Sequence, residues 1–243
     1  MNQNTFASFS CAANDAHPSR GVPQRNGEGS SIAGAGSPDR ATPFQFALQQ
    51  TPVCLAVADG IGGQIGGEVA SAIVVKNLSN HAWKSPLDHS INDAVQDCEK
   101  AIRNEMRKDP QLKVMGTTLA GVVLYRDCYF HFNIGDSRVY SHSNGELTRL
   151  SIDDVRLPSG ALTQSIGGTP GILPQKIETH LGNRTIGKNE ILLICSDGLT
   201  DMVDEDELAN LLGSDSTLSA RPLVNRALSR GGFDNISVLL VRS

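Results

Sequence analysis

Apolar runs along the chain predict a series of β-strands interrupted by two helical blocks. Strands are expected where four or more apolar residues follow one another or alternate with polar ones, at 6–11, 53–58, 117–124, 129–134, 138–142, 190–195 and 236–241. The runs at 53–58 and 190–195 contain almost no polar residue, which is typical of a buried strand.

Helices are predicted where the apolar residues recur every three or four positions. The first helical block covers 68–83 and 85–109, and in its second helix Ile91, Val95, Cys98 and Ile102 form one stripe. The second block covers 204–212 and 218–230. We therefore expect an α+β fold with largely antiparallel sheets in a single domain over 1–243, with a partly disordered tail and first strand at 1–15 and an exposed loop at 27–43.

Composition excludes some classes of function. The net charge of -5 and the pI near 5.7 argue against a nucleic-acid or anionic-membrane partner. No apolar stretch approaches the ~20 residues that span a bilayer, and no signal peptide is recognisable at the N-terminus. The five cysteines contain no CxxC pair, so we expect them to be buried thiols in a reducing cytoplasm.

Four aspartates lie at the ends of predicted strands. Asp59 and Asp197 each follow a buried run and precede a glycine, Asp234 precedes the last strand, and Asp136 lies in a Gly-Asp break. The first three can meet at one sheet edge if the last strand runs opposite to the other two. Because clustered carboxylates need positive charge nearby, and only Arg138 accompanies them, we expect Mg²⁺ or Mn²⁺ at this edge.

Two alternatives remain for the stretch "ADGIGGQIGG" at 58–67. A nucleotide-binding loop is disfavoured, because the third glycine of GxGxxG is replaced by Ile65 and the stretch has no lysine for a phosphate-binding P-loop. Each aspartate alone could be an ordinary turn residue, since Asp-Gly is a common turn dipeptide. Four of them at strand ends favour the metal site over turns.

Five motifs in order give the sequence a family resemblance. "VADGIGGQIGGEVAS", "MGTTLAGVVL", "NIGDSRVY", "LICSDGLTD" and "GGFDNISVLLV" resemble the metal-dependent Ser/Thr protein phosphatases of type 2C in their bacterial form, over 20–241. The resemblance implies a four-layer α-β-β-α sandwich of two antiparallel sheets flanked by helices. It also implies attack on phosphorus by a hydroxide bound to two, or three, Mn²⁺ or Mg²⁺ ions.

The resemblance also assigns residues to this centre. Asp59 would bridge two metal ions, the Gly60 carbonyl would bind one of them, and Asp197 and Asp234 would bind the other. Asp136 would help to hold a third ion. The position that is often His in other branches of the family is Ile61, so His17, His131 and His142 are candidates for a general acid by residue type only.

Two segments depart from the family pattern. In "RGVPQRNGEG", Glu28 matches the acid that holds a metal-bound water, but Gly29 replaces the next acid and Gln24 replaces the phosphate-binding arginine. Arg20 or Arg25 could bind the phosphate instead, or both could be solvated loop residues. The mobile flap after Asp153-Asp154 is expected to be shortened, which would leave the cleft open.

The expected activity is hydrolysis of phosphoserine and phosphothreonine in proteins, with the substrates of a cytoplasmic Ser/Thr kinase as partners and a monomeric chain. The alternative is a weakly active or inactive family member that binds phosphoproteins or a kinase, and the changes at Gln24 and Gly29 motivate it. The intact metal-binding acids favour the enzyme.

Overall fold

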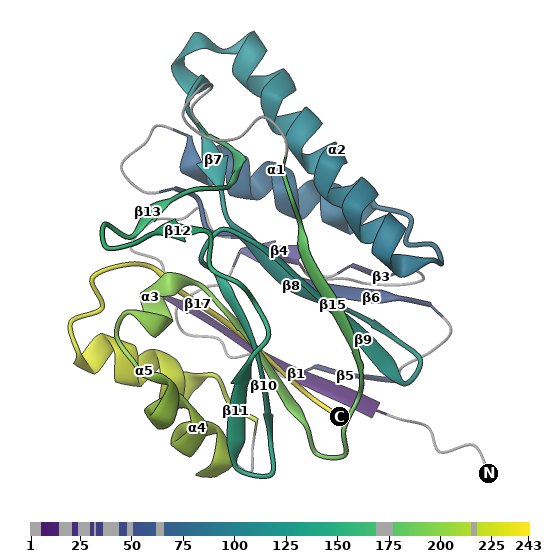
Figure 1. Ribbon diagram of the computed structural model, residues 1–243, viewed down its shortest axis with the longest axis vertical. Helices are drawn as coiled ribbons and strands as arrows, with labels where there is room; N and C mark the ends of the chain where they lie inside the picture. The colour runs from purple at the N-terminus through teal and green to yellow at the C-terminus, as the bar shows by residue number, and fades with distance from the viewer. Residues whose placement is uncertain are drawn as a thin grey trace.

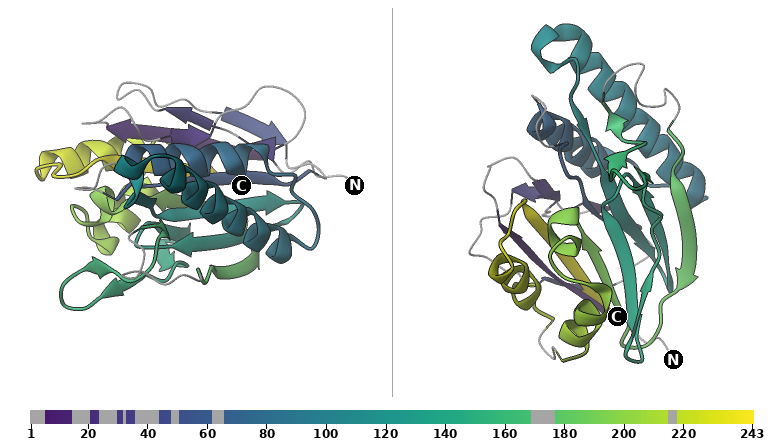
Figure 2. Two further views of the ribbon diagram at one scale, coloured as in Figure 1. Left: turned by 90° about the horizontal axis from the view of Figure 1, so that it is seen from above. Right: turned by 60° about the vertical axis from the view of Figure 1, so that its left-hand side comes forward.

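Two β-sheets pack face to face, and helices cover the outer face of each sheet (Figures 1 and 2). The computed structural model describes 6–14, 21–23, 30–31, 33–35, 44–47, 51–61, 66–168, 177–214 and 218–243. This arrangement confirms the predicted four-layer α-β-β-α sandwich. None of the helices in these ranges is long and apolar enough to span a membrane.

The first sheet has six strands, all paired antiparallel. Their order across the sheet is β11 (Glu146–Arg149), β10 (Arg138–Ser143), β16 (Ile191–Cys195), β17 (Ile236–Arg242), β1 (Phe6–Asn14) and β5 (Phe44–Ala47). The last strand of the chain thus lies in the middle of this sheet, beside β16.

The second sheet has five strands, and its one parallel pair lies at an edge. The order is β15 (His180–Thr185), β9 (Cys128–Ile134), β8 (Leu119–Tyr125), β6 (Val53–Val57) and β3 (Ser30–Ser31), with β3 parallel to β6. Three further pairs contain only two or three residues per strand: β2 (Gly21–Pro23) with β4 (Ala33–Ala35), β7 (Gly116–Thr117) with β14 (Ile166–Gly167), and β12 (Val155–Arg156) with β13 (Ala161–Leu162).

The helices divide between the two sheets. The second sheet carries α1 (Gly67–Asn80) and α2 (Leu87–Lys108), followed by the 3₁₀ turn η1 (Pro110–Leu112), and the first sheet carries α3 (Asp197–Thr200), α4 (Glu205–Ser214) and α5 (Arg221–Ser229). The apolar stripe predicted for α2 is fully buried against the sheet. The stripe explains why one face of α2 is buried.

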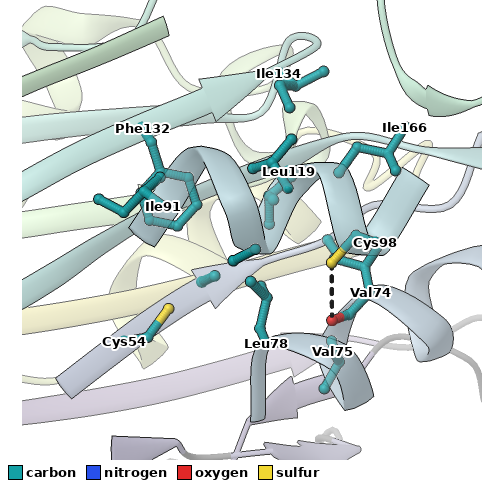
Figure 3. Close-up of a cluster of buried hydrophobic side chains, with 14 of the residues drawn as sticks. Cys54, Val74, Val75, Leu78, Ile91, Cys98, Leu119, Phe132, Ile134 and Ile166 are labelled. Carbon is teal, nitrogen blue, oxygen red and sulfur yellow. Dashed lines mark hydrogen bonds between the residues drawn. The ribbon is translucent and has the colours of Figure 1, made fainter. Parts of the chain in front are cut away.

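The core consists of three apolar layers, and the period of two along β6 explains how one strand serves two of them. Cys54 and Ala56 face the helices, and Leu55 and Val57 face the other sheet. The helix-side layer includes the residues drawn in Figure 3, where the Sγ of Cys98 in α2 donates to the carbonyl of Val74 in α1 at 3.8 Å. Because β6 is buried on both faces, its sequence is one continuous apolar run.

Several predicted boundaries differ from the structure. The helix expected from 218 begins only at Arg221, because Leu218 has a φ of 51°, which a right-handed helix excludes. The helix expected over 68–83 ends at Asn80. The first strand is longer than expected, and the predicted loop at 27–43 contains the short strands β3 and β4.

A buried carboxylate joins the two sheets. Glu190, directly before β16, accepts hydrogen bonds from the Tyr129 hydroxyl at 2.8 Å and from the backbone N–H of Gly187 at 2.6 Å, and Ser141 donates to the same oxygen as Tyr129. Tyr129 belongs to the second sheet and Ser141 to the first. Burial raises the pKa of the Tyr129 hydroxyl, and the Glu190 carboxylate raises it further, so the phenol stays protonated as the donor.

Replacing Tyr129 by Phe should therefore destabilise the fold. The substitution leaves the buried Glu190 carboxylate one donor short, and we expect the free energy of unfolding to fall by about 1–3 kcal/mol in urea titrations. The same change at the partly buried Tyr125 is the control and should cost less than about 0.5 kcal/mol. Equal effects at both positions would contradict the role assigned to Glu190.

Candidate metal centre

Strand register brings the ends of both sheets to one edge of the sandwich. In the first sheet Cys195 pairs with Val238 and with Arg138, so the end of β16 meets the starts of β17 and β10. In the second sheet Val57 pairs with Ala120, and Leu119 pairs with Ile134, so the ends of β6 and β9 lie together. The sequence set the condition that the last strand run opposite to the other two. The condition is met for β16, which pairs antiparallel with β17, whereas β6 lies in the other sheet.

The four predicted aspartates lie within two residues of these strand ends. Asp59 follows β6 and Asp197 follows β16, while Asp234 precedes β17. Asp136 lies in the connection that crosses from β9 in one sheet to β10 in the other. We call this end of the sandwich, with Asp59, Asp136, Asp197 and Asp234, the acidic edge.

Asp59 is buried and its backbone is fixed by the neighbouring strand. Its carbonyl accepts from the N–H of Thr118 at 2.8 Å, and its own N–H donates to the Thr118 Oγ1 at 3.3 Å. The next residue, Gly60, leaves no room for a side chain, because a Cβ there would lie 2.3 Å from the carbonyl oxygen of Gly67. This glycine allows the start of α1 to pack directly against the strand end.

A hydroxyl pair connects the Asp59 and Asp136 segments. The Oγ1 of Thr118 lies 2.6 Å from the Oγ of Ser137, the residue after Asp136, and both side chains are buried. Thr118 therefore contacts the backbone of Asp59 on one side and the Asp136 turn on the other. The sequence reasoning did not find this pair, although both hydroxyls lie in the motifs "MGTTLAGVVL" and "NIGDSRVY".

The carboxylates of the acidic edge repel one another. Burial, with added repulsion from Asp197, raises the pKa of Asp136 to about 6. Asp201, which the sequence reasoning missed, also has a raised pKa because of burial, with added repulsion from Asp197 and Asp234. The signal was its position four residues after Asp197, which places both on one face of α3.

Arg138 offsets part of the rise in the pKa of Asp201, but its direct partner is Asp153. Its guanidinium binds Asp153, with Nη2 2.7 Å from Oδ2, and Arg149 reaches the same oxygen at 3.1 Å. The adjacent Asp154 accepts from the N–H of Gly135 at 2.8 Å and lies 2.8 Å from the His180 ring. The Asp153-Asp154 dipeptide thus fixes both sides of the Asp136 turn.

The donor set fits a hard cation. The Oδ1 of Asp197 is buried without a hydrogen-bond partner, and every predicted side-chain ligand is a carboxylate, the type that Mg²⁺ and Mn²⁺ prefer. Gly198 brings the end of β16 close to the start of β17, because a Cβ there would lie 2.1 Å from the carbonyl oxygen of Asn235. Within the described ranges, no three His, Cys, Asp or Glu side chains form a group that could hold a metal ion by themselves.

Some predicted site residues lie outside the described residues. These are Arg20, Arg25 and Glu28, together with the substituted positions Gln24 and Gly29 and the candidate His17. His142 pairs with Ile191, at the end of β10 away from Asp197, and lies about 13 Å along the strand from the Arg138–Cys195 pair, which is itself two residues short of Asp197. That separation excludes His142 as a direct proton donor at the acidic edge. Burial lowers the pKa of His131, and nearby Arg184 lowers it further, so this ring is neutral at pH 7.

Comparison with known proteins assigns the family. Residues 28–229 match the family described as Protein phosphatase 2C. The chain belongs to the protein phosphatase 2C family. It is 32% identical to the serine/threonine phosphatase stp of Listeria monocytogenes, over 76% of this chain and 82% of that protein. The predicted membership of the type 2C phosphatases is therefore confirmed.

Solved structures agree with this family assignment. The fold matches the serine/threonine phosphatase PstP/Ppp of Mycobacterium tuberculosis with a TM-score of 0.77 and 25% identity, over 98% of this chain and 99% of that one. It also matches the catalytic domain of PstP in complex with two manganese ions, with a TM-score of 0.75 and 27% identity over the same shares of the two chains.

Removing the Thr118 hydroxyl should loosen the Asp59 segment. Thr118→Val leaves the buried Ser137 hydroxyl and the Asp59 N–H without this partner, and we expect a loss of about 1–3 kcal/mol in the free energy of unfolding. Thr118→Ser keeps the oxygen and should recover at least half of that loss. Urea titration measures both variants, and equal losses in Val and Ser would show that the hydroxyl pair contributes nothing.

Gly198 should tolerate no side chain. A methyl group would overlap the Asn235 carbonyl, so we expect Gly198→Ala to lower the unfolding free energy by about 3 kcal/mol or more. Gly213→Ala is the matched control, because its Cβ would meet nothing closer than 3.7 Å within α4, and it should be neutral or stabilising by about 0.5–1 kcal/mol. A stable Gly198→Ala chain in thermal denaturation would contradict the close contact.

Proposed function

We propose that this chain hydrolyses phosphoserine and phosphothreonine in proteins, with Mn²⁺ or Mg²⁺ held at the acidic edge. The observation that carries the proposal is the convergence of Asp136, Asp197 and Asp234 at one end of the sandwich, with a buried Asp197 oxygen that has no hydrogen-bond partner. Family membership and the manganese ions of the PstP catalytic domain support it.

The proposed ligands are those expected from the sequence. Asp59, the Gly60 carbonyl, Asp197 and Asp234 would hold two ions between them, and Asp136 would contribute to a third. When bound, the pair of cations supplies the positive charge that activates water and neutralises the phosphoryl group. The buried backbone around Asp59 keeps this carboxylate in place before any cation arrives.

Three residues near the N-terminus complete the proposed site. Glu28 accepts a hydrogen bond from the attacking water, which orients the water for in-line displacement. Arg20 or Arg25 binds the phosphate oxygens in place of the arginine that Gln24 replaces, because a guanidinium can reach a phosphate from a nearby backbone position. The leaving oxygen takes its proton from water or from a group that is not yet identified.

The proposed substrates are phosphoproteins of a cytoplasmic Ser/Thr kinase, and the chain acts as a monomer. Cys54, Cys98, Cys128 and Cys195 are all free thiols, as expected in a reducing compartment. No observation among the described residues favours a nucleic-acid or membrane partner.

Loss of one carboxylate at the acidic edge should abolish activity. We expect Asp59→Asn to lower Mn²⁺-dependent phosphate release from an aryl phosphate by at least 100-fold, because this side chain is proposed to bind both ions. Asp127→Asn is the control, since Asp127 is exposed in the turn between β8 and β9 at the opposite end of the sheet. It should retain activity within twofold.

The same assay separates the enzyme from a non-catalytic family member. Tight Mn²⁺ binding by calorimetry without turnover of the native chain would favour a binding module. If activity is present but low, Gln24→Arg or Gly29→Asp should raise it. Full activity in Asp59→Asn would contradict the two-metal site.

A further inference from the structure

The turn between α5 and β17 presents an aromatic ring at the acidic edge. Phe233 exposes 84% of its surface and directly precedes Asp234. Figure 1 shows this turn beside α3, the helix that begins with Asp197. An exposed phenylalanine next to a proposed metal ligand is a hydrophobic surface at the place where a phosphoprotein must bind.

The ring contacts the backbone of its own turn. Gly231 has a φ of 120°, and a Cβ on it would lie 2.8 Å from the Phe233 ring, so the ring rests on the glycine backbone. Gly232 is also left-handed, with a φ of 53°, and lies against Leu228 in the same way. The backbone conformation at these two consecutive positions favours glycine, and it sets the direction of the chain as it enters Phe233.

Ion pairs tie the turn to the helices below it. The guanidinium of Arg230 donates to the carbonyl of Met202 at 2.8 Å and lies 2.6 Å from a carboxylate oxygen of Glu207. The N–H of Gly232 donates to the carbonyl of Ala227 at 3.2 Å. The ring is therefore presented by an anchored turn, which lowers the entropy lost when it contacts a partner.

Geometry limits which part of a substrate can reach the ring. The Cα atoms of Phe233 and Asp234 are about 3.8 Å apart, and an extended peptide advances about 3.3 Å per residue. Side chains up to three residues from a phosphorylated residue held at the acidic edge, about 10 Å along an extended peptide, are therefore the ones within range of the Phe233 ring. The neighbouring carboxyl group of Asp201, which is not among the proposed metal ligands, disfavours an acidic residue at that place.

We propose that Phe233 is a specificity-determining residue, whose ring packs against an apolar, non-acidic side chain two or three residues from the phosphorylated residue of the substrate. The proposal rests on the proposed function, because it requires a phosphoprotein bound at the acidic edge. It adds a preference for one class of flanking residue.

Matched phosphothreonine peptides test it. Peptides that carry Leu, Ala or Asp at one position, two or three residues to either side of the phosphothreonine, are compared by kcat/KM with Mn²⁺. For the native chain we expect kcat/KM to be about five- to tenfold higher for the Leu peptide than for the Ala peptide at one position at least. The Asp peptide should have a lower kcat/KM than the Ala peptide. In Phe233→Ala the Leu preference should fall to within twofold, while the penalty for Asp remains.

Two further variants make the test specific. Phe233→Leu keeps an apolar side chain and should retain at least half of the preference. Leu157→Ala removes an equally exposed side chain, 83%, from the β12–β13 hairpin and should keep the native preference. A native chain without Leu preference, or a preference unchanged in Phe233→Ala or lost equally in Leu157→Ala, would overturn the proposal.

Other outcomes distinguish the two proposals from each other. A native chain that releases no phosphate from an aryl phosphate fails the proposed function itself, whereas an active chain with no Phe233 effect fails only this inference. Light scattering at the assay concentration tests whether Phe233 contacts a second copy of this chain and not a substrate. A native dimer that becomes a monomer in Phe233→Ala would overturn the assignment to substrate.

Discussion

Burial of the apolar layer between the two sheets is the constraint on which the acidic edge depends. Leu55 and Val57 of one sheet pack against Ile194 and Leu239 of the other, and this packing fixes the relative position of the sheets. Asp59 and Asp197 directly follow the buried parts of β6 and β16, so the core fixes where their backbones leave the two sheets. The Tyr129–Glu190 hydrogen bond also joins the two sheets.

The carboxylates of the acidic edge repel one another when no cation is bound, and hydrogen bonds from neighbouring residues hold their backbone segments in place. Asp136 and Asp201 have raised pKa values because burial and Asp197 disfavour their ionised forms. Hydrogen bonds hold the segments nonetheless: Thr118 binds the Asp59 backbone, and Asp154 binds the N–H of Gly135. A site kept in place by its backbone, with carboxylates that repel one another, is suited to bind divalent cations.

The sequence predicted the architecture better than the interactions that hold the site. Continuous apolar runs identified β6 and β16, and the Asp-Gly pairs after them identified the edge, because both signals are local. The hydrogen bond between Thr118 and Ser137 joins two residues 19 positions apart, each next to a strand, and depends on how those strands are placed, which no local pattern shows. Arg138 seemed available to the acids by its sequence position, but Asp153 binds it. The start of α5 shifted because Leu218 is left-handed.

The central claim is that the acidic edge holds divalent cations, and calorimetric titration with Mn²⁺ tests it most directly. The account predicts two tight sites per native chain and the loss of at least one of them in Asp197→Asn, whose unpartnered carboxylate oxygen has no other role in the described structure. A control titration with Asp127→Asn should match the native chain. Native protein that binds no Mn²⁺, or Asp197→Asn protein that binds it as tightly as the native chain, would contradict the account.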